Sequence, residues 1–230
     1  MALQISEHFY SIQGEGTHAG VPAVFMRLTG CNLHCSWCDS VEVWRKGDRV
    51  TDPQLISLVK DKYGRQFQQG AHLIFTGGEP MIQQRNLAHF MEQIRMVTDL
   101  DPYVEVETNG TFAPQDEFAE HVQHWTLSPK LSNSGEPPEK RVMHPSWEKE
   151  LNTYGLSYCI KLVVRPQDLA EADQLVTNYN LHPHRVWLMP CASTQAELMG
   201  NVEIVEHCMQ RGYRYSTRLQ VLIWNQLTGV

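Results

Sequence analysis

Apolar runs with β-strand character alternate with amphipathic helical stretches along the chain, and no other feature of the sequence constrains the fold as strongly. The patterns predict strands at residues 21–29, 72–75, 103–107, 125–127, 158–164, 186–189 and 213–217. Helices are expected at residues 52–70, 85–97, 117–124, 167–178 and 195–211. The first of these opens on an Asp52 N-cap with Pro53 at the first helical position. Short connections between such elements require parallel strands with helical crossovers, so we expect an α/β sheet or barrel.

The chain is long enough to bury one full hydrophobic core. It has 230 residues and a mass of 26.4 kDa, with 42% hydrophobic and 20% charged residues, which is ordinary for a globular enzyme. No internal repeat or low-complexity tract divides it. We therefore expect a single domain over residues 1–230, with an irregular segment at about 131–146.

Charge and hydropathy exclude several classes of protein. The net charge is −7 and the pI about 5.9, and the lysines and arginines are scattered, which argues against a broad nucleic-acid-binding surface. No apolar run approaches the ~20 residues needed to span a bilayer, and the N-terminal residues lack the layout of a signal peptide. We expect a cytoplasmic protein without nucleic-acid or membrane partners.

Unusual short sequences stand directly after the predicted strands. They are Thr76-Gly-Gly-Glu-Pro80, Glu107-Thr-Asn-Gly110, Ser128-Pro-Lys130 and Met189-Pro-Cys191. In parallel α/β folds ligands bind at the carboxyl ends of the strands. These turns should therefore converge on one pocket.

Three of the six cysteines, Cys31, Cys35 and Cys38, lie within eight residues, directly after the strand at 21–29. In a reducing compartment clustered thiols are metal ligands or catalytic groups rather than disulfides. Four thiolates would complete a structural zinc or an iron–sulfur cluster, whereas three leave one metal position open. A zinc site that adds His34 or a distant residue is the alternative, although structural zinc ligands usually come as two pairs. The other three cysteines stand alone and fit small buried residues.

The spacing Cys31-x3-Cys35-x2-Cys38 resembles that of the radical S-adenosylmethionine superfamily. With Ile12-Gln-Gly-Glu-Gly16, Arg27, Cys38-Asp-Ser40 and the turns after the strands, the chain resembles the 7-carboxy-7-deazaguanine synthase family from about residue 8 to the C-terminus. The resemblance implies one radical S-adenosylmethionine domain with a partial TIM-like barrel of the shortened β6/α3 type. It also implies a cluster loop at 31–38, a C-terminal extension from about residue 213, and a homodimer.

This resemblance also implies an enzymatic activity and the cofactors that the activity needs. It implies a 4Fe-4S cluster on three cysteines, with S-adenosylmethionine on the open iron as the source of a 5′-deoxyadenosyl radical. The implied reaction contracts the ring of 6-carboxy-5,6,7,8-tetrahydropterin to 7-carboxy-7-deazaguanine with loss of ammonia, a lyase step toward queuosine-type bases. Mg²⁺ and a one-electron donor, flavodoxin-like or other, are implied as well.

The resemblance further implies which residues form the site. Those expected to contact the pterin are Ile12, Gln13, Gly14, Glu15, Arg27, Thr76 and Gln220. Those expected to contact S-adenosylmethionine are Trp37, Gly78, Glu79, Glu107, Thr108, Ser128, Pro129, Lys130, Met189 and Pro190. The expected metal ligands are Cys31, Cys35 and Cys38 for the cluster and Ser40 for Mg²⁺, and no catalytic acid or base is assigned.

The chemistry of these residue types suits a pterin acid. Gln13 and Glu15 offer paired hydrogen bonds to an amide and amino edge, and the Arg27 guanidinium matches a carboxylate. A hydroxyl or carboxylate after the last cysteine suits Mg²⁺, which takes few protein ligands. Taken singly, the segment 13–16 is better explained as a surface turn and Arg27 as a strand-end salt bridge, and Asp39 is also a candidate helix cap. Only their combination is specific.

This sequence differs from the usual pattern of the family at two places. Met189-Pro-Cys-Ala192 stands where many relatives have Gln-Pro-Met-Asp, and Gln220 stands where a histidine is common. Two other functions remain open from the residues alone. One is an enzyme that installs a glycyl radical on a partner protein, and the other is a non-catalytic zinc or iron–sulfur module.

Overall fold

The computed structural model describes residues 1–151, 156–227 and 229 of the chain. Within them one nine-stranded sheet runs in the order β3-β1-β2-β4-β5-β6-β7-β8-β9. Its strands are β1 (Ala2–Ile12), β2 (Pro22–Leu28), β3 (Asp48–Thr51), β4 (His72–Gly77), β5 (Val104–Thr108), β6 (His124–Leu127), β7 (Tyr158–Val164), β8 (Val186–Pro190) and β9 (Arg214–Tyr215).

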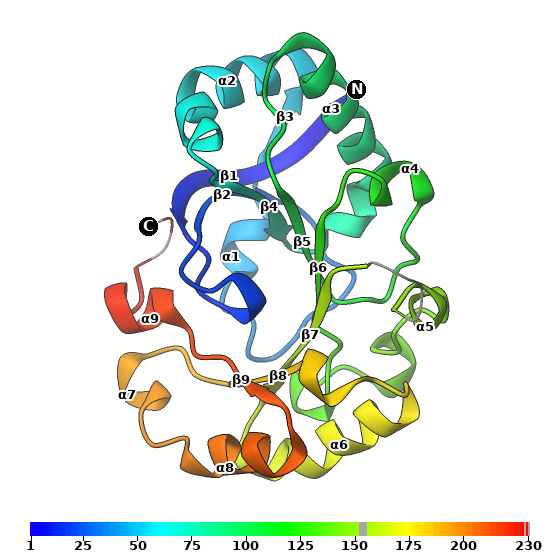
Figure 1. Cartoon of the computed structure of the whole chain (residues 1–230), viewed down its shortest axis with the longest axis vertical. Coiled ribbons are helices and arrows are strands. Elements are labelled where there is room, and N and C mark those ends of the chain that lie inside the picture. Colours follow the sequence, from blue (N-terminus) through cyan, green and yellow to red (C-terminus); the bar gives the residue numbers. More distant parts are fainter. Residues whose placement is uncertain (152–155, 228, 230) are drawn as a thin grey trace.

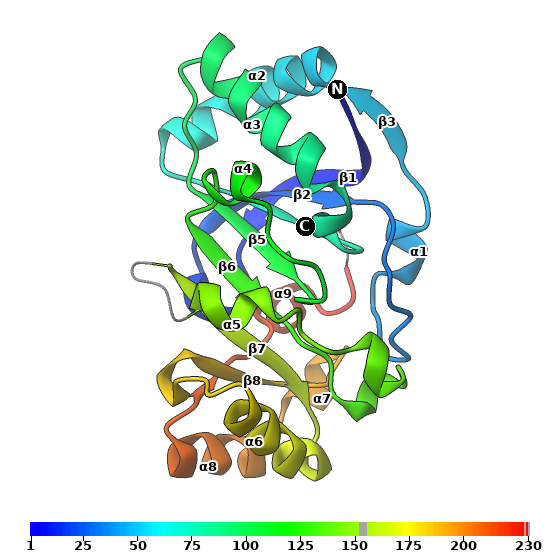
Figure 2. The same ribbon diagram turned by 90° about the vertical axis from the view of Figure 1, so that its right-hand side faces the viewer.

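All neighbouring strands from β2 to β9 are parallel, whereas β1 pairs antiparallel with β2 and β3. Figures 1 and 2 show the sheet curling around a central space, with most helices on its outer side. The predicted α/β partial barrel is therefore confirmed. The helices are α1 (Val41–Trp44), α2 (Asp52–Gln68), α3 (Gln84–Val97), α4 (Asp116–Ala119), α5 (Ser146–Leu151), α6 (Leu169–Asn178), α7 (Gln195–Leu198), α8 (Val202–Arg211) and α9 (Leu219–Trp224).

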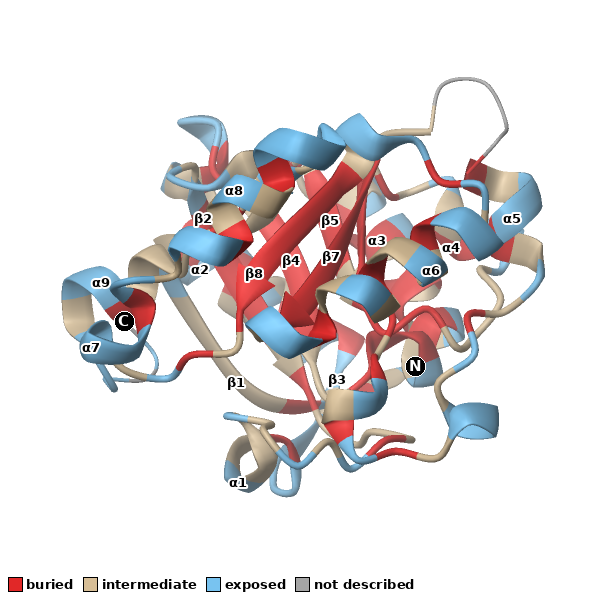
Figure 3. Cartoon of the chain, turned by 90° about the horizontal axis from the view of Figure 1, so that it is seen from below, coloured by how far each residue is buried: buried red, intermediate tan, exposed pale blue. Residues whose placement is uncertain are grey.

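The two faces of the parallel strands differ in chemistry. Val104 and Val106 of β5 pack into the large core between sheet and helices, and Ile160 and Leu162 of β7 do the same. Successive side chains of a strand point to opposite faces, so the residues between these apolar ones point into the barrel. They include ionisable groups, and strands β7 and β8 are buried along their whole length (Figure 3). Charged side chains such as Glu105 and Lys161 are therefore buried on the inner side of the sheet.

The predicted helices need three corrections. The N-cap of α2 is Thr51 rather than Asp52, because the Thr51 backbone N–H donates to the Gln54 side chain in a capping box. The expected helix at 195–211 is two helices, α7 and α8, separated at Gly200, whose φ of +82° a helix does not admit. The expected helix at 117–124 is only the short α4, because the chain enters β6 at His124.

Five of the strands and helices have no counterpart among the predictions. Strand β1 spans eleven residues, and its pairing with β2 is interrupted by an irregularity between Ile5 and Glu7. Strand β3 pairs only with β1, while α1, α5 and α9 are short helices. Each depends on a partner distant in sequence rather than on a strong local pattern.

Candidate active site

The three clustered cysteines lie on the loop between β2 and α1. All three are free thiols of intermediate exposure. The Cys38 backbone N–H donates to the Cys35 carbonyl at 3.1 Å, and the Ser36 N–H donates to the Ser134 carbonyl at 2.8 Å. The loop is therefore folded on itself and tied to the segment after β6.

A glycine pair after β4 packs directly against this loop. The Gly78 N–H donates to the Leu28 carbonyl at 3.0 Å, and the Glu79 N–H donates to the Gly30 carbonyl at 2.8 Å. A Cβ on Gly78 would lie 1.8 Å from the Gly30 oxygen, which no side chain can accommodate. Glycine at this position thus allows the backbone of one turn to lie against the other.

The arrangement of the three sulfurs fits a multi-iron cluster better than a single zinc ion. At least one pair of them is more than 4.8 Å apart, because His18, His72 and Glu105 are the only potential ligands in the described chain that bring three donor atoms within that distance. A tetrahedral zinc with bonds of about 2.3 Å would hold its sulfurs about 3.8 Å apart. His34, the alternative zinc ligand, is exposed, and its ring lies 6.1 Å from that of Trp44.

Burial raises the pKa of the Cys31 thiol to about 11 and that of Cys35 in the same direction. Lys130 acts the other way on both thiols through its positive charge. Its Nζ accordingly lies near them, 5.5 Å from the centre of the Trp37 ring and 2.9 Å from the Ser128 hydroxyl. Thiolates on this loop therefore require a bound cation to be stable, as a cluster would supply.

Glu79 connects the turns after β4 and β5. Its side chain is fully buried, and its carboxylate accepts hydrogen bonds from the Met81 N–H, the Thr108 hydroxyl and the Asn109 N–H at 2.7–3.0 Å. Burial raises its pKa, and these donors oppose the rise. In this structure Glu79 and Thr108 organise the two turns, and their expected contact with S-adenosylmethionine stays a prediction.

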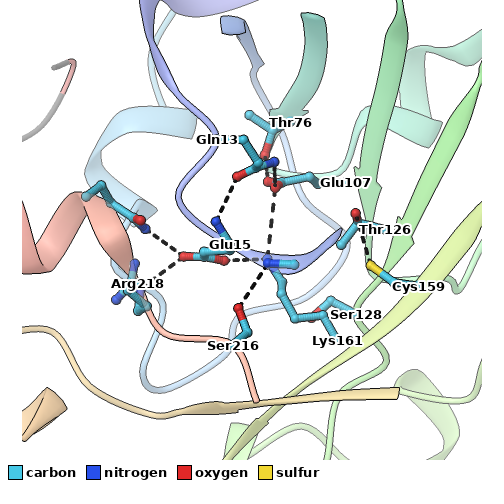
Figure 4. Close-up of polar contacts among 12 residues, drawn as sticks. Gln13, Glu15, Thr76, Glu107, Thr126, Ser128, Cys159, Lys161, Ser216 and Arg218 are labelled. Atoms are coloured by element: carbon cyan, nitrogen blue, oxygen red, sulfur yellow. Dashed lines mark hydrogen bonds and ion pairs between the residues drawn. The ribbon is translucent and has the colours of Figure 1, made fainter. Parts of the chain in front are cut away.

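Glu15 is the centre of a second, charged group of residues (Figure 4). Its carboxylate contacts Lys161 Nζ at 2.5 Å, Arg218 Nε at 3.0 Å and Gln220 Nε2 at 2.7 Å. These partners come from β7 and from the start of α9, so they join distant parts of the chain. The alternative interpretation of segment 13–16 as a surface turn is wrong for Gln13 and Glu15, because both side chains are held inside the barrel.

Electrostatics fixes the charge states in this group. Burial would raise the pKa of Glu15, but the positive charges of Lys161 and Arg218 outweigh it and hold that pKa well below its usual range. Burial would likewise lower the pKa of Lys161, and Glu15 with Glu107 raises it instead. The group is therefore a network of ionised side chains rather than neutral acids and bases.

Arg218 links this network to the cysteine loop. Besides Glu15, its guanidinium contacts the carboxylate of Asp39, the residue that directly follows Cys38, and donates to the Ala192 carbonyl at 2.7 Å. Asp39 is therefore engaged with Arg218, and Ser40 rather than Asp39 is the N-cap of α1. The Ser40 hydroxyl lies 3.7 Å from the Cys38 sulfur.

Gln13, Thr76 and Glu107 form the adjoining part of the network. Gln13 Nε2 donates to Glu107 at 3.1 Å, the Thr76 hydroxyl donates to Glu107 at 2.7 Å, and Gln13 Oε1 accepts from the Glu15 N–H at 3.1 Å. Lys161 lies 4.0 Å from Glu107. Gln13 and Thr76, both expected at the pterin, are thus joined through Glu107, which was expected at S-adenosylmethionine.

The other predicted residues lie around these two groups. Gly14 lies against Gln220, because a Cβ on Gly14 would meet Gln220 Oε1 at 1.7 Å. Arg27 pairs with Glu7 on β1, Nε to Oε1 at 2.8 Å. The remaining ones stand at strand ends or on the cysteine loop: Ile12 ends β1, Met189 and Pro190 end β8, Ser128 and Pro129 follow β6, and Trp37 bonds Asn133 at 3.1 Å.

Two residues of the charged group were not predicted. Lys161 lies in a strand that is otherwise apolar, Tyr158–Val164, and a lysine at an inward position of such a strand is a recognisable sign of an internal charge partner. Arg218 has no such sign, because it follows β9 in an irregular stretch. Lys161 could therefore have been suspected from the sequence, whereas Arg218 is identified only by its contacts.

No helix in the described part of the chain has both the length and the apolar character needed to cross a membrane.

A family model described as a 4Fe-4S single cluster domain matches residues 12–120. The 7-carboxy-7-deazaguanine synthase of Pyrobaculum aerophilum is 31% identical to this chain, over 99% of it and 97% of the relative. The 7-carboxy-7-deazaguanine synthase of Halobacterium salinarum is 32% identical, over 97% of this chain and 91% of the relative. Among solved structures, the crystal structure of QueE from Escherichia coli superposes with a TM-score of 0.70 at 26% identity, covering 95% of each chain.

Proposed function

The chain belongs to the 7-carboxy-7-deazaguanine synthase family, and from this premise we propose that it converts 6-carboxy-5,6,7,8-tetrahydropterin to 7-carboxy-7-deazaguanine with loss of ammonia. The observation that carries the proposal is the position of Arg218. It contacts Glu15 of the internal network and Asp39 beside the last cluster cysteine. One side chain therefore joins the polar residues proposed to bind the pterin with the loop proposed to hold an iron–sulfur cluster.

Cys31, Cys35 and Cys38 would hold a 4Fe-4S cluster, and their free, partly exposed thiols fit that group. The bound cluster supplies the electron that cleaves S-adenosylmethionine. Lys130 provides positive charge next to the thiolates. The glycine pair at 77–78 holds the loop against the turn after β4, where S-adenosylmethionine is expected to contact the backbone.

The internal network is proposed to bind the pterin. Gln13 and Thr76 present amide and hydroxyl groups oriented by Glu107, and Glu15 is oriented by Lys161 and Arg218. Because these partners restrict the rotamers of the side chains, the pocket is organised before substrate arrives. Arg27 is proposed to receive the substrate carboxylate.

Mg²⁺, a homodimer, a flavodoxin-like or other one-electron donor, and a cytoplasmic location are proposed with the activity. Ser40 is the proposed Mg²⁺ ligand, since its hydroxyl lies next to Cys38. Ser40→Ala should change the Mg²⁺ dependence of turnover while the iron content stays constant. An unchanged Mg²⁺ titration would reassign the ligand. Light scattering of the purified protein measures the oligomeric state.

The decisive test is an anaerobic incubation of the reconstituted protein with S-adenosylmethionine, dithionite, Mg²⁺ and the carboxy-tetrahydropterin. Mass detection of the deazaguanine acid would support the activity. Cys35→Ala should lose cluster iron and all turnover, whereas Cys208→Ala, which changes a buried cysteine away from the loop, should keep both. Wild-type protein with a full cluster that cleaves S-adenosylmethionine but leaves the pterin unchanged would refute the proposal.

A further inference from the structure

Four ionisable side chains gather at the amino-terminal end of the central strands, away from the cysteine loop. His72 begins β4, Glu105 is the second residue of β5, and His124 begins β6. His18 ends η1 (Gly16–His18), the short helical turn that follows the Glu15 segment inside the barrel. The proposed radical chemistry uses none of these four residues.

Three of these side chains share a common centre. Nδ1 of His18 lies 3.1 Å from Glu105 Oε1, and Nδ1 of His72 contacts the same oxygen. The three donor atoms all lie within 4.8 Å of one another. The ring of His124 lies against that of His18, with 4.6 Å between ring centres.

One nitrogen in the group lacks a hydrogen-bond partner. His124 is fully buried, and its Nδ1 bonds the Ser157 hydroxyl at 2.8 Å, which leaves its Nε2 buried and unpartnered. Nδ1 of His18 is also buried, and its polar neighbour is Glu105 Oε1 at 3.1 Å. Buried polar atoms are normally satisfied, so an unpartnered imidazole nitrogen beside this carboxylate indicates a missing ligand.

The chemistry of the donors identifies that ligand. Two imidazoles with one carboxylate form a typical set for zinc, whereas Mg²⁺ and Ca²⁺ prefer oxygen ligands alone. Glu105 is nearly inaccessible, while His18 and His72 are partly exposed and leave a route for the ion.

We propose that His18, His72 and Glu105 bind a structural Zn²⁺ ion at the end of the barrel opposite the cluster, where the His124 ring packs against that of His18. The ion joins η1 to β4 and β5. Because His18 is only three residues after Glu15, the metal fixes the segment that presents Gln13 and Glu15 to the pocket. Its role is thus to position that segment and to close the barrel.

The experiment measures metal content rather than activity. The anaerobically reconstituted protein, loaded with Zn²⁺ and dialysed, should hold about four irons and about one zinc per chain. Replacing all three clustered cysteines by serine should remove the iron and leave the zinc. His18→Gln/His72→Gln should do the reverse. The matched control is His182→Gln/His184→Gln, which changes two exposed, mutually stacked histidines and should keep both metals.

Two further readouts apply to the protein without the clustered cysteines. Co²⁺ bound in place of Zn²⁺ should give d–d bands without thiolate charge transfer, and added Zn²⁺ should raise its unfolding midpoint. Glu105→Gln should abolish that rise, and it tests the site if the double histidine variant does not fold. Absence of zinc from the protein lacking these cysteines, or zinc retained in full by the His18 and His72 variants, would overturn the proposal. The four side chains would then be a metal-free hydrogen-bonded cluster that closes this end of the barrel.

Discussion

Replacing Lys161 by methionine should destabilise the protein strongly, because it removes a cation from inside the barrel and leaves its partners there. The Lys161 side chain is 8% exposed and that of Glu15 12%, and their charged atoms are 2.5 Å apart. Methionine keeps the length and the apolar stem, so the change removes the charge and creates little cavity.

The magnitude follows from what remains around Glu15. Removing one member of a buried ion pair typically costs 3–5 kcal/mol, because the other charge is left uncompensated. Here Arg218 and Gln220 still contact Glu15 Oε1. We therefore expect the lower end, about 3 kcal/mol in the free energy of unfolding. For a chain of this length that corresponds to a fall in the unfolding midpoint of roughly 6–12 °C.

Urea and thermal unfolding of the cluster-free protein measure this effect. Arg211→Met is the matched control, since Arg211 is 56% exposed in its pair with Asp173 and should cost less than about 1 kcal/mol. Glu15→Gln/Lys161→Met should be more stable than the sum of the single changes by roughly 0.5–3 kcal/mol, because it leaves no orphaned charge from this pair. Equal effects of Lys161→Met and Arg211→Met, or strict additivity in the cycle, would refute the assignment of a coupled internal network.

Three other changes test separate parts of the structure. Gly78→Ala should lower the iron content, because the added Cβ would displace Gly30. The control Gly64→Ala lies in open space on α2, so it should keep the iron and raise the free energy of unfolding by roughly 0.5–1 kcal/mol. Equal iron content in both variants would contradict the packing of the two turns. Arg27→Ala should lower kcat/KM by about 10- to 150-fold with the cluster intact, since a hydrogen bond to a charged group contributes about 1.5–3 kcal/mol, and unchanged kinetics would exclude a substrate contact. In zinc-free protein, burial raises the pKa of Glu105, but its histidine partners outweigh burial and lower that pKa from 4.5 to about 2. The ionised Glu105 therefore contributes to the free energy of unfolding above pH 4.5, and this contribution is lost as the pH falls toward 2. Acid titration of unfolding should therefore be flatter for Glu105→Gln, and identical profiles would argue against the shift.

The sequence predicted the elements whose patterns are local. Strands β2, β4, β5, β6, β7 and β8 fall where apolar runs end in distinctive turns, and β7 has the predicted bounds. Strand β1 was missed because its identity depends on antiparallel pairing with β2 rather than on clean alternation. The division between α7 and α8 was missed because Gly200 stands inside a continuous helical pattern, and only its positive φ shows the break.

The candidate site divides in the same way. The cysteine loop and the turns after β4, β5 and β6 are recognisable as short motifs, and the structure brings the Gly78 turn against the Cys31 loop. The partners of Glu15 are not local, because Lys161 is 146 residues away in sequence and Arg218 is 203 residues away. The partners of Glu15 can be identified only once the order of the strands in the sheet is known.

The charge pattern of the pocket bears on how a substrate carboxylate would be received. Lys161 and Arg218 are both held by Glu15 in a buried setting, so drawing either away would leave that carboxylate uncompensated. Arg27 differs, because its pair with Glu7 is 22% and 29% exposed, and such pairs contribute at most about 1 kcal/mol. A substrate carboxylate can replace Glu7 at little cost and gain a bidentate contact in return. If Arg27 receives the substrate carboxylate as proposed, the ion pair with Glu7 would hold the guanidinium in position until the pterin binds.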